Sequence, residues 1–370
     1  MRPIDLDYNA TTPLLPEAWQ AMRTAPGGNP SSAHQAGRKA RQALEAARER
    51  VAGLLGAEPD EVTFTSGATE ANNLAVFGLV TGHAATSHLE HPCVVEPLEQ
   101  LEARGCSVEW LPVDARGMIQ FASVPPATRL VCVMLANHET GAIQPVRDIA
   151  LSLPGVAIHC DAAQAVGKMP VNFRGLGVTT LTASAHKFGG PKGVGVLVTK
   201  RGTKLQPLLF GGHQQQGRRP GTEPVPLALG MAVALEHATR NMNANSAKFE
   251  SLRERLWIRL NEVASPVVLN GPEIGAADVL PTTLNVSFPG CRADLLLMAL
   301  DLAGVACSTG SACSSGSLLP SPVLRAMRVP DDVLRSALRF SFGPPTDFAD
   351  IDEAADRIGS AVRNARDHGV

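Results

Sequence analysis

The segment SAHKFGGPKGVG, residues 184–195, places Lys187 between a histidine and a run of glycines. A lysine in such a turn is most often a solvated cation. Its amine can also act as a nucleophile and form an imine with an aldehyde cofactor. The surrounding motifs decide between these two interpretations.

A candidate phosphate site precedes this lysine in the sequence. The segment FTSGATEAN, residues 64–72, follows a predicted strand and opens a predicted helix. Gly67 permits a tight turn, and Ala68 and Thr69 then present backbone N–H groups at a helix N-terminus, where a phosphate is favoured. Turns of this composition also occur in many loops that bind nothing, so the motif alone is a weak signal.

A carboxylate lies between the two motifs. The segment HCDAAQAVGK, residues 159–168, places Asp161 at the end of an apolar strand, where ligands bind in open α/β sheets. Asp161 could pair with a protonated pyridine nitrogen, or it could be the N-cap of a following helix. Gln164 lies one turn further on.

Together these residues indicate pyridoxal phosphate, which needs a lysine amine, an acid at its ring nitrogen and an anchored phosphate. Each motif lies at the end of a predicted strand, so Lys187, Asp161 and the phosphate turn can converge on one crevice. Ser184 and His186, beside the lysine, could donate hydrogen bonds to the same phosphate.

The bulk composition limits the class of protein. The chain has 370 residues, of which 44% are hydrophobic, and a formal net charge of −2. This length is ample for a large core, and the charge argues against a nucleic-acid partner. The N-terminus lacks the apolar segment of a signal peptide, and no stretch has the length of a membrane span. We therefore expect a cytoplasmic protein without a membrane or nucleic-acid partner.

The seven cysteines are scattered without CxxC pairs, which fits a reduced chain better than a disulfide framework or a metal site. Four of them lie in or beside apolar runs and are expected to be buried, inert thiols. These are Cys93, Cys106, Cys132 and Cys160.

The elements that must position the motifs alternate along the chain. Short apolar runs separated by amphipathic stretches predict an α/β fold, with a mostly parallel sheet covered by helices. From about residue 248 the pattern changes to a smaller α+β domain. The predicted strands are 61–66, 129–137, 156–164, 193–200, 282–290 and 337–343, and the predicted helices are 38–56, 68–82 and 249–263.

These motifs resemble a known family. SGATEANN, DAAQAVGK and SAHKFGGPKGVG are similar to the class V aminotransferases, which are fold-type I pyridoxal-phosphate enzymes. DYNATTP, GNPSSAH and GSACSSGSLLPSPVLRAM narrow the resemblance to the cysteine desulfurases, over residues 5 to about 355. The resemblance implies a large cofactor-binding domain, 14–250, and a small domain, 1–13 and 251–370, which carries a catalytic-cysteine loop.

The resemblance also implies a role for each matching residue. Lys187 would form the imine with pyridoxal phosphate, Asp161 would pair with its ring nitrogen, and Gln164 would touch its phenolic oxygen. His91 would stack on the ring and manage protons, although a lone histidine is more often structural. The phosphate would be held by Ala68, Thr69, Ser184 and His186.

The remaining implied roles concern substrate and partner. Arg339 would grip the substrate carboxylate rather than form a surface salt bridge, and Asn9 could also face the substrate. Thr222 would reach the phosphate of a neighbouring subunit, which implies a homodimer. His138 replaces an asparagine that contacts cofactor or substrate in the family, so its role is open. The segment Gln214–Gln216 departs from a more charged family pattern.

Cys313 lies in the Gly- and Ser-rich stretch 307–317. Taken alone it could be a spectator thiol, but an exposed reactive thiol is open to oxidation, and flexible flanks would let it enter and leave a site. It resembles the persulfide-forming cysteine of the first group of cysteine desulfurases. Cys307 matches no catalytic position and is interpreted as structural.

The implied reaction takes sulfur from L-cysteine, gives L-alanine and leaves a persulfide on Cys313 for a sulfur acceptor or an iron–sulfur scaffold protein. The alternatives are another class V enzyme, such as a selenocysteine lyase or an aminotransferase, and a non-catalytic sulfur-relay protein. Cys313 argues against an aminotransferase, which has no need of it. Lys187, Asp161, Gln164 and Cys313 together argue against the relay protein.

Overall fold

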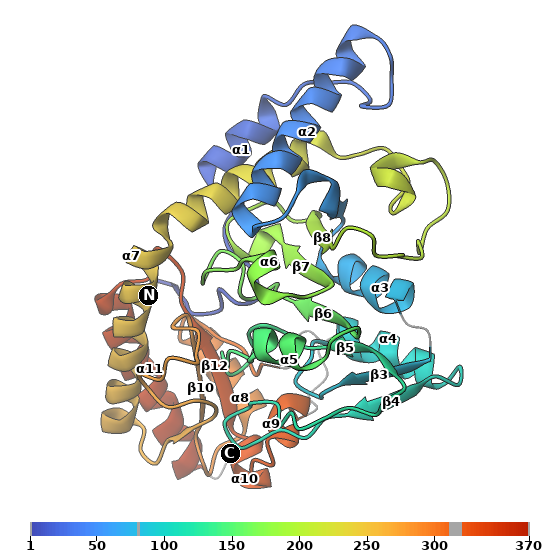
Figure 1. The fold of residues 1–370 in the computed structure, drawn as a ribbon. Coiled ribbons are helices and arrows are strands. Elements are labelled where there is room, and N and C mark those ends of the chain that lie inside the picture. The colour runs from blue at the N-terminus through green and yellow to red at the C-terminus, as the bar shows by residue number, and fades with distance from the viewer. Residues whose placement is uncertain (1, 80–81, 311–319, 369–370) are drawn as a thin grey trace.

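The computed structural model describes residues 2–79, 82–310 and 320–368. Its centre is a seven-stranded sheet with the order β2-β8-β7-β6-β5-β3-β4 (Figure 1). Every neighbouring pair is parallel except the two that β8 forms, so the predicted mostly parallel sheet is confirmed. The strands are β2 (Val62–Thr65), β3 (His83–Thr86), β4 (Ser107–Trp110), β5 (Thr128–Cys132), β6 (Ala157–Asp161), β7 (Thr180–Ser184) and β8 (Gly195–Thr199).

Strand β8 runs against its neighbours because its connection from β7 is short. Residues 185–194 hold one 3-10 turn, Ala185–Lys187, whereas a parallel return needs a crossover of a dozen residues or more. This return leaves Lys187 just beyond the carboxyl end of β7. The strands predicted at 61–66, 129–137, 156–164 and 193–200 are present, and the structure adds β3, β4 and β7.

Helices cover this sheet and connect it to a second core. Helix α2 ends where Gly56 adopts a left-handed conformation with φ 68°, as its sequence predicted. No helix in the described ranges is both long and apolar enough to cross a membrane. The helices are α1 (Pro16–Arg23), α2 (Gln35–Leu55), α3 (Ala68–Leu79), α4 (Pro92–Glu102), α5 (Val146–Ser152), α6 (Phe173–Leu176), α7 (Val225–Val263), α8 (Ala293–Leu302), α9 (Pro322–Ala326), α10 (Asp331–Leu334) and α11 (Phe348–Asp367).

The second core surrounds a smaller sheet in which β10 (Thr283–Ser287) lies between β12 (Ala337–Ser341) and β9 (Val268–Leu269). Helix α7 belongs to both cores: Met231 and Leu235 pack in the first, and Leu252 and Leu256 in the second (Figure 1). The predicted helix 249–263 is therefore the last part of a longer one. The domain boundary at 250/251 stays a prediction.

The N-terminal segment also joins the two cores. Strand β1 (Ile4–Asp5) pairs in parallel with β11 (Val305–Ala306), and Ile4 and Leu6 are buried in the second core. Beyond them the chain crosses to the first core, where the hydroxyl of Thr12 donates to the carbonyl of His186 at 2.8 Å. A short N-terminal segment therefore fixes the end of β7 relative to the smaller sheet.

Gly195 offers a test of how β8 is placed. A Cβ there would lie 2.7 Å from the carbonyl oxygen of Ala183 and 2.8 Å from backbone atoms of Gly67, which cannot rotate away. Gly195→Ala should therefore lower the free energy of unfolding by about 1–3 kcal/mol, measured by chemical denaturation. The control is Gly53→Ala, where a Cβ meets nothing within 4 Å and a helical alanine should be neutral or stabilising. Equal stability of the two variants would contradict the expected clash.

Candidate active site

A cavity of about 690 Å³ opens at the carboxyl ends of β6 and β7, which end at Asp161 and Ser184. Eleven of the predicted site residues line it, although they come from distant parts of the sequence. They are Asn9, Ala68, Thr69, His91, His138, Asp161, Gln164, Ser184, His186, Lys187 and Arg339.

Lys187 extends from the 3-10 turn after β7 toward the N-terminal segment. Its Nζ donates to the carbonyl oxygens of Asn9 at 2.6 Å and Ala10 at 3.0 Å. Thr12 fixes the backbone beside it, because its Oγ1 also accepts from the N–H of Gly189 at 2.6 Å. The amine is therefore held at a defined point of the cavity wall.

The N-terminus of α3 forms one end of the cavity. The first intrahelical hydrogen bond runs from the N–H of Ala71 to the carbonyl of Gly67 at 3.1 Å, so the N–H groups of Ala68 and Thr69 have no acceptor within the helix. His186 lines the same cavity, and burial together with Lys187 lowers its pKa to about 4. At neutral pH this end therefore offers N–H donors and an uncharged imidazole, which suits a phosphate.

Asp161 is oriented by residues that the sequence analysis missed. Its Oδ2 accepts from Asn72 Nδ2 at 2.7 Å, and its Oδ1 accepts from the N–H of Ala163 at 2.9 Å. The other atom of the Asn72 amide, Oδ1, lies 3.0 Å from His159 Nε2. Burial lowers the pKa of His159 to about 4, so its neutral ring carries the proton on Nε2 and donates it to Asn72.

Two sequence signals could have found this arrangement. His159 and Asp161 alternate along β6 and so share one face of the sheet. Asn72 follows the phosphate turn by one helical turn, which brings it under the same cavity.

His91 is the N-cap of α4 and lines the cavity. Its Nδ1 accepts from the N–H of Cys93 at 3.1 Å, which leaves the ring proton on Nε2. Burial is the main cause that lowers the pKa of His91, so the ring is neutral at pH 7. Burial also raises the pKa of the Cys93 thiol, which stays protonated and is no nucleophile.

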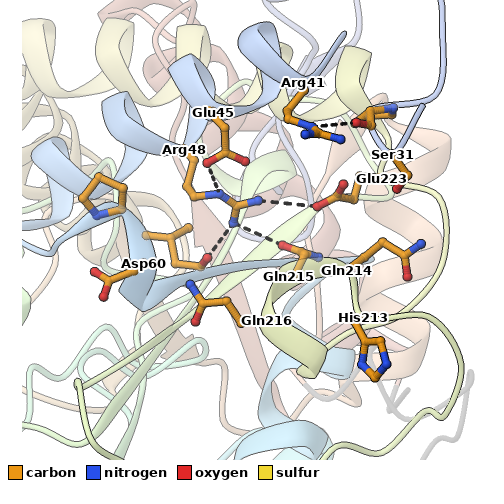
Figure 2. A pocket seen from close by; sticks show the side chains of 13 residues that line it. Ser31, Arg41, Glu45, Arg48, Asp60, His213, Gln214, Gln215, Gln216 and Glu223 are labelled. Atoms are coloured by element: carbon orange, nitrogen blue, oxygen red, sulfur yellow. Dashed lines mark hydrogen bonds and ion pairs between the residues drawn. The ribbon is translucent and has the colours of Figure 1, made fainter. Parts of the chain in front are cut away.

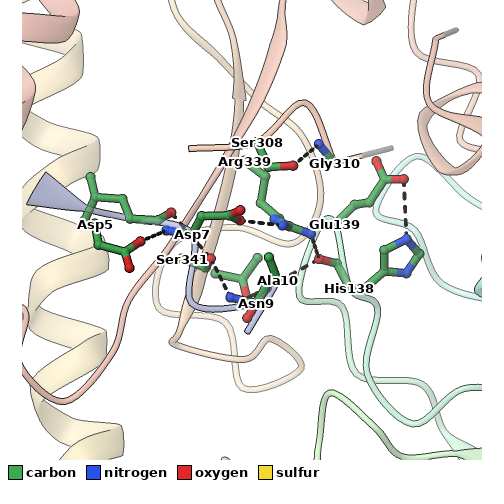
Figure 3. A network of polar contacts seen from close by, with 12 residues as sticks. Asp5, Asp7, Asn9, Ala10, His138, Glu139, Ser308, Gly310, Arg339 and Ser341 are labelled. Carbon is green, nitrogen blue, oxygen red and sulfur yellow. Dashed lines mark hydrogen bonds and ion pairs between the residues drawn. The ribbon is translucent and has the colours of Figure 1, made fainter. Parts of the chain in front are cut away.

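His138 lies opposite, and its ring meets that of His91 edge-on with centroids 5.5 Å apart. Burial holds the pKa of His138 well below its usual value. Its Nε2 lies 3.6 Å from Oε1 of Glu139, whose pKa burial raises to about 7 (Figure 3). The other oxygen of Glu139 accepts from the hydroxyl of Ser321 at 2.6 Å.

Arg339, on β12, reaches the cavity from the smaller sheet and is 3% exposed. It donates to Oδ1 of Asp7 at 2.7 Å and to the carbonyl of His138 at 2.9 Å (Figure 3). A guanidinium has five N–H groups, so three remain after these two bonds. Its Nε is buried and has no hydrogen-bond partner among the described residues. The sequence analysis missed Asp7, which fixes this side chain.

Two predicted residues are not part of this cavity in the described chain. Thr222 is exposed and lies outside it. Cys313 lies outside the described residues. Cys307, interpreted as structural, is buried, and burial raises the pKa of its thiol to about 12.

The segment before Thr222 borders a second hollow of about 590 Å³, around Arg48 (Figure 2). Gln215 bonds both backbone groups of Phe64 on the edge strand β2: its Oε1 accepts from the N–H at 2.6 Å and its Nε2 donates to the carbonyl at 2.7 Å. Arg48 donates to the same Oε1 at 3.3 Å and is paired with Glu223. An amide can donate and accept at once, which lets Gln215 bond both backbone groups of Phe64.

The lining of the first cavity fits pyridoxal phosphate. It offers an amine, a carboxylate whose position is fixed, helix N–H groups, and an apolar wall that includes Met134 and Ala136. Nδ1 of His138, like Nε of Arg339, is buried and lacks a hydrogen-bond partner among the described residues. Buried polar atoms are usually bonded, so a polar ligand in the cavity would satisfy these two.

Glu90 gives a pH-dependent test of the buried wall. Its Oε1 accepts from the N–H of Met134 at 2.6 Å, and burial, helped by the charge of Asp161, raises its pKa to about 8. The folded protein therefore keeps a proton that the unfolded chain loses near pH 4.5, and the free energy of unfolding falls as the pH rises through this window. Glu90→Gln cannot ionise at this position, so the variant lacks this fall of the free energy of unfolding with pH.

Relative to the wild type, Glu90→Gln should gain stability from about pH 5 to about pH 8, by at most about 1.4 kcal/mol per pH unit, measured by urea unfolding. The matched control is Glu99→Gln at an exposed position. Parallel pH curves for the wild type and Glu90→Gln would show that the carboxyl group is ionised in the folded protein.

Comparisons with known proteins agree with this geometry. The aminotransferase class-V family matches residues 4–353. The chain is 40% identical to the cysteine desulfurase IscS of Dictyoglomus turgidum, over 99% of this chain and 96% of that one, and 40% identical to the IscS-like cysteine desulfurase of Mycobacterium tuberculosis, over 98% and 96%. A solved NifS-like protein superposes with a TM-score of 0.90 at 33% identity, over 98% of this chain and all of that one. The chain therefore belongs to the aminotransferase class-V family and, within it, to the cysteine desulfurases.

Proposed function

We propose that this protein is a pyridoxal-phosphate-dependent cysteine desulfurase that takes sulfur from L-cysteine and releases L-alanine. The observation that carries the proposal is one cavity in which the amine of Lys187, the carboxylate of Asp161 and the guanidinium of Arg339 meet. Pyridoxal phosphate, when bound, supplies an electron sink for bonds to the substrate α-carbon. The protein residues supply orientation and proton handling.

The cofactor would be held from three sides. The helix N–H groups of Ala68 and Thr69 and the neutral ring of His186 would bind its phosphate. Asp161, held by Asn72, would pair with the protonated ring nitrogen of the cofactor, and Lys187 would bond the aldehyde carbon. The neutral ring of His91 would lie over its ring and hold a proton at Nε2. These roles are supported by the placement of each residue in the cavity wall.

The substrate carboxylate would bind the N–H groups that Arg339 still has available. Asp7 and the carbonyl of His138 already hold this side chain, so little conformational entropy is lost when a carboxylate binds. The remaining Nε and Nη donors can form a bidentate pair, which is the strong geometry for a carboxylate.

The sulfur acceptor within the protein would be Cys313. Its thiolate would attack the sulfur of the bound substrate, so that an S–S bond forms while the Cβ–S bond breaks and its electrons stay with carbon. The described residues on either side are tied to the cavity wall: the N–H of Ser308 donates to the carbonyl of Arg339 at 3.1 Å, and Ser321 donates to Glu139. Both flanks of the loop therefore lie near the substrate site.

Partner interactions complete the proposal. The homodimer, with Thr222 reaching the phosphate site of a neighbouring subunit, is supported by the exposure of Thr222 and by the Gln215 and Arg48 contacts that hold its segment (Figure 2). A sulfur acceptor, either an iron–sulfur scaffold or a thiolation partner, would take the persulfide. The cysteines of the described ranges are free thiols, which suits the cytoplasmic location that we propose.

Replacement of the proposed acceptor tests the reaction. Cys313→Ser should keep the visible absorbance of the bound cofactor but lose at least about a hundredfold in alanine and sulfide release from L-cysteine, and mass spectrometry should find no added sulfur at position 313. Cys106→Ser, at a partly exposed position, is the matched control and should behave as wild type. Normal turnover by Cys313→Ser would refute the persulfide mechanism.

Arg339→Gln tests carboxylate binding. Loss of charge-assisted hydrogen bonds worth about 1.5–3 kcal/mol should raise KM for L-cysteine roughly tenfold to a hundredfold, while the absorbance of the bound cofactor stays unchanged. Steady-state kinetics measure the effect, and cysteamine, which lacks the carboxylate, should be processed equally by wild type and variant. An unchanged KM would assign Arg339 a structural role.

A further inference from the structure

Lys168 ends the motif DAAQAVGK and has no part in the mechanism above. Residues 163–169 form a tight turn after β6, and Gln164 and Lys168 lie four residues apart on its one face. Gly167 makes the turn possible with φ 80°, where a Cβ would come within 2.6 Å of Phe188. The lysine side chain borders another cavity of about 290 Å³, which Lys187 also lines, and its Nζ reaches Asn9 and Gln164 of the site.

The amine of Lys168 contacts two amide oxygens. Nζ of Lys168 lies 2.6 Å from Oε1 of Gln164 and 2.8 Å from Oδ1 of Asn9. Among the described residues Lys168 forms no ion pair with a carboxylate. Its hydrogen-bond partners there are two neutral amides. Burial, together with the nearby charges of Lys187 and Arg339, lowers the pKa of Lys168 well below its usual value.

The orientation of both amides is fixed by acceptors on their other side. Nδ2 of Asn9 faces the carbonyl of His138 at 3.3 Å and Oγ1 of Thr283 at 2.9 Å. Nε2 of Gln164 faces the carbonyl of Asn9 at 3.0 Å. Since a carbonyl can only accept, the nitrogen of each amide must lie on that side and the oxygen on the side of Lys168.

These contacts have a consequence for the cavity. The Gln164 amide has two N–H groups, and the carbonyl of Asn9 takes one of them. With its oxygen held by Lys168, the second N–H is left for a ligand in the cavity that Gln164 lines. Without Lys168 only the single bond to the carbonyl of Asn9 would hold the Gln164 amide, so its second N–H would be less firmly directed into the cavity.

We propose that Lys168 is a positioning residue, which donates to the amides of Gln164 and Asn9 and thereby keeps an N–H of Gln164 directed at the phenolic oxygen of the cofactor. The inference rests on the proposed cofactor role of the cavity. Lys168 itself does not touch the cavity, and its effect passes through Gln164.

The test is the pH dependence of the visible absorbance of the bound cofactor, measured on the holoenzyme without substrate. Lys168→Met removes the donor that holds the Gln164 amide, so the phenolic oxygen loses a firmly placed N–H and becomes more basic. The bound cofactor then keeps its proton to a higher pH. The absorbance midpoint should move upward by at least about half a pH unit. Lys168→Arg keeps donors for both amide oxygens, so its midpoint should lie close to that of the wild type. If Lys168→Met does not fold, Lys168→Gln, which is polar and uncharged, should show the same upward shift of the midpoint.

The matched control is Lys200→Met at an exposed position, which should leave the midpoint unchanged. A wild-type midpoint in both Lys168→Met and Lys168→Gln would overturn the proposal. The readout needs no substrate, so it is separate from the proposed reaction: a wild-type holoenzyme that releases no alanine from L-cysteine would refute the function and leave the role of Lys168 to be judged on the midpoint alone.

Discussion

The structure depends on the contact between the amine of Lys187 and the backbone carbonyls of Asn9 and Ala10. The lysine follows a strand of the large sheet, and the carbonyls belong to a segment that starts in the second core. Two residues earlier, Asp7 pairs with Arg339 from the smaller sheet. The short stretch from Asp7 to Ala10 thus positions both the amine of Lys187 and the guanidinium of Arg339, which come from different cores. The number of residues in this stretch limits how far apart the two groups can lie.

Burial sets the protonation of the site before any ligand binds. His91, His138 and His186 all have lowered pKa values, mainly because the protein removes water from their rings. They are neutral at pH 7 and act as hydrogen-bond groups that can take up a proton. Asp161 is held in place by hydrogen bonds from Asn72 and from the backbone N–H of Ala163. One cavity therefore holds neutral imidazoles beside a carboxyl group whose position is fixed, which suits proton transfer around a cofactor ring.

In the proposed function, the parts of the chain that reach other molecules lie outside this cavity. The segment before Thr222 is attached to the edge of the sheet by Gln215, which occupies hydrogen-bonding groups of Phe64 that an edge strand would otherwise expose. The described residues on either side of Cys313 are bonded to the cavity side: Ser308 to Arg339 and Ser321 to Glu139. In the proposed function the cavity handles the amino acid, and these two attached segments serve the neighbouring subunit and the sulfur acceptor.

The sequence by itself indicated the fold class, the phosphate turn and the residues Asp161 and Lys187, because apolar runs of strand length and the polar residues at their ends are local features. It also fixed the end of α2, because Gly56 suits a left-handed cap. The roles of Asn9, His91, His138 and Arg339 came from the resemblance to the cysteine desulfurases. Only the tertiary structure decided which neighbouring side chains hold these residues in position. The contacts of Asn72 with His159, of Asp7 with Arg339 and of Lys168 with Gln164 and Asn9 mostly join distant positions, and a single sequence carries no record of distance in space. The antiparallel direction of β8 was likewise set by a return too short for a crossover.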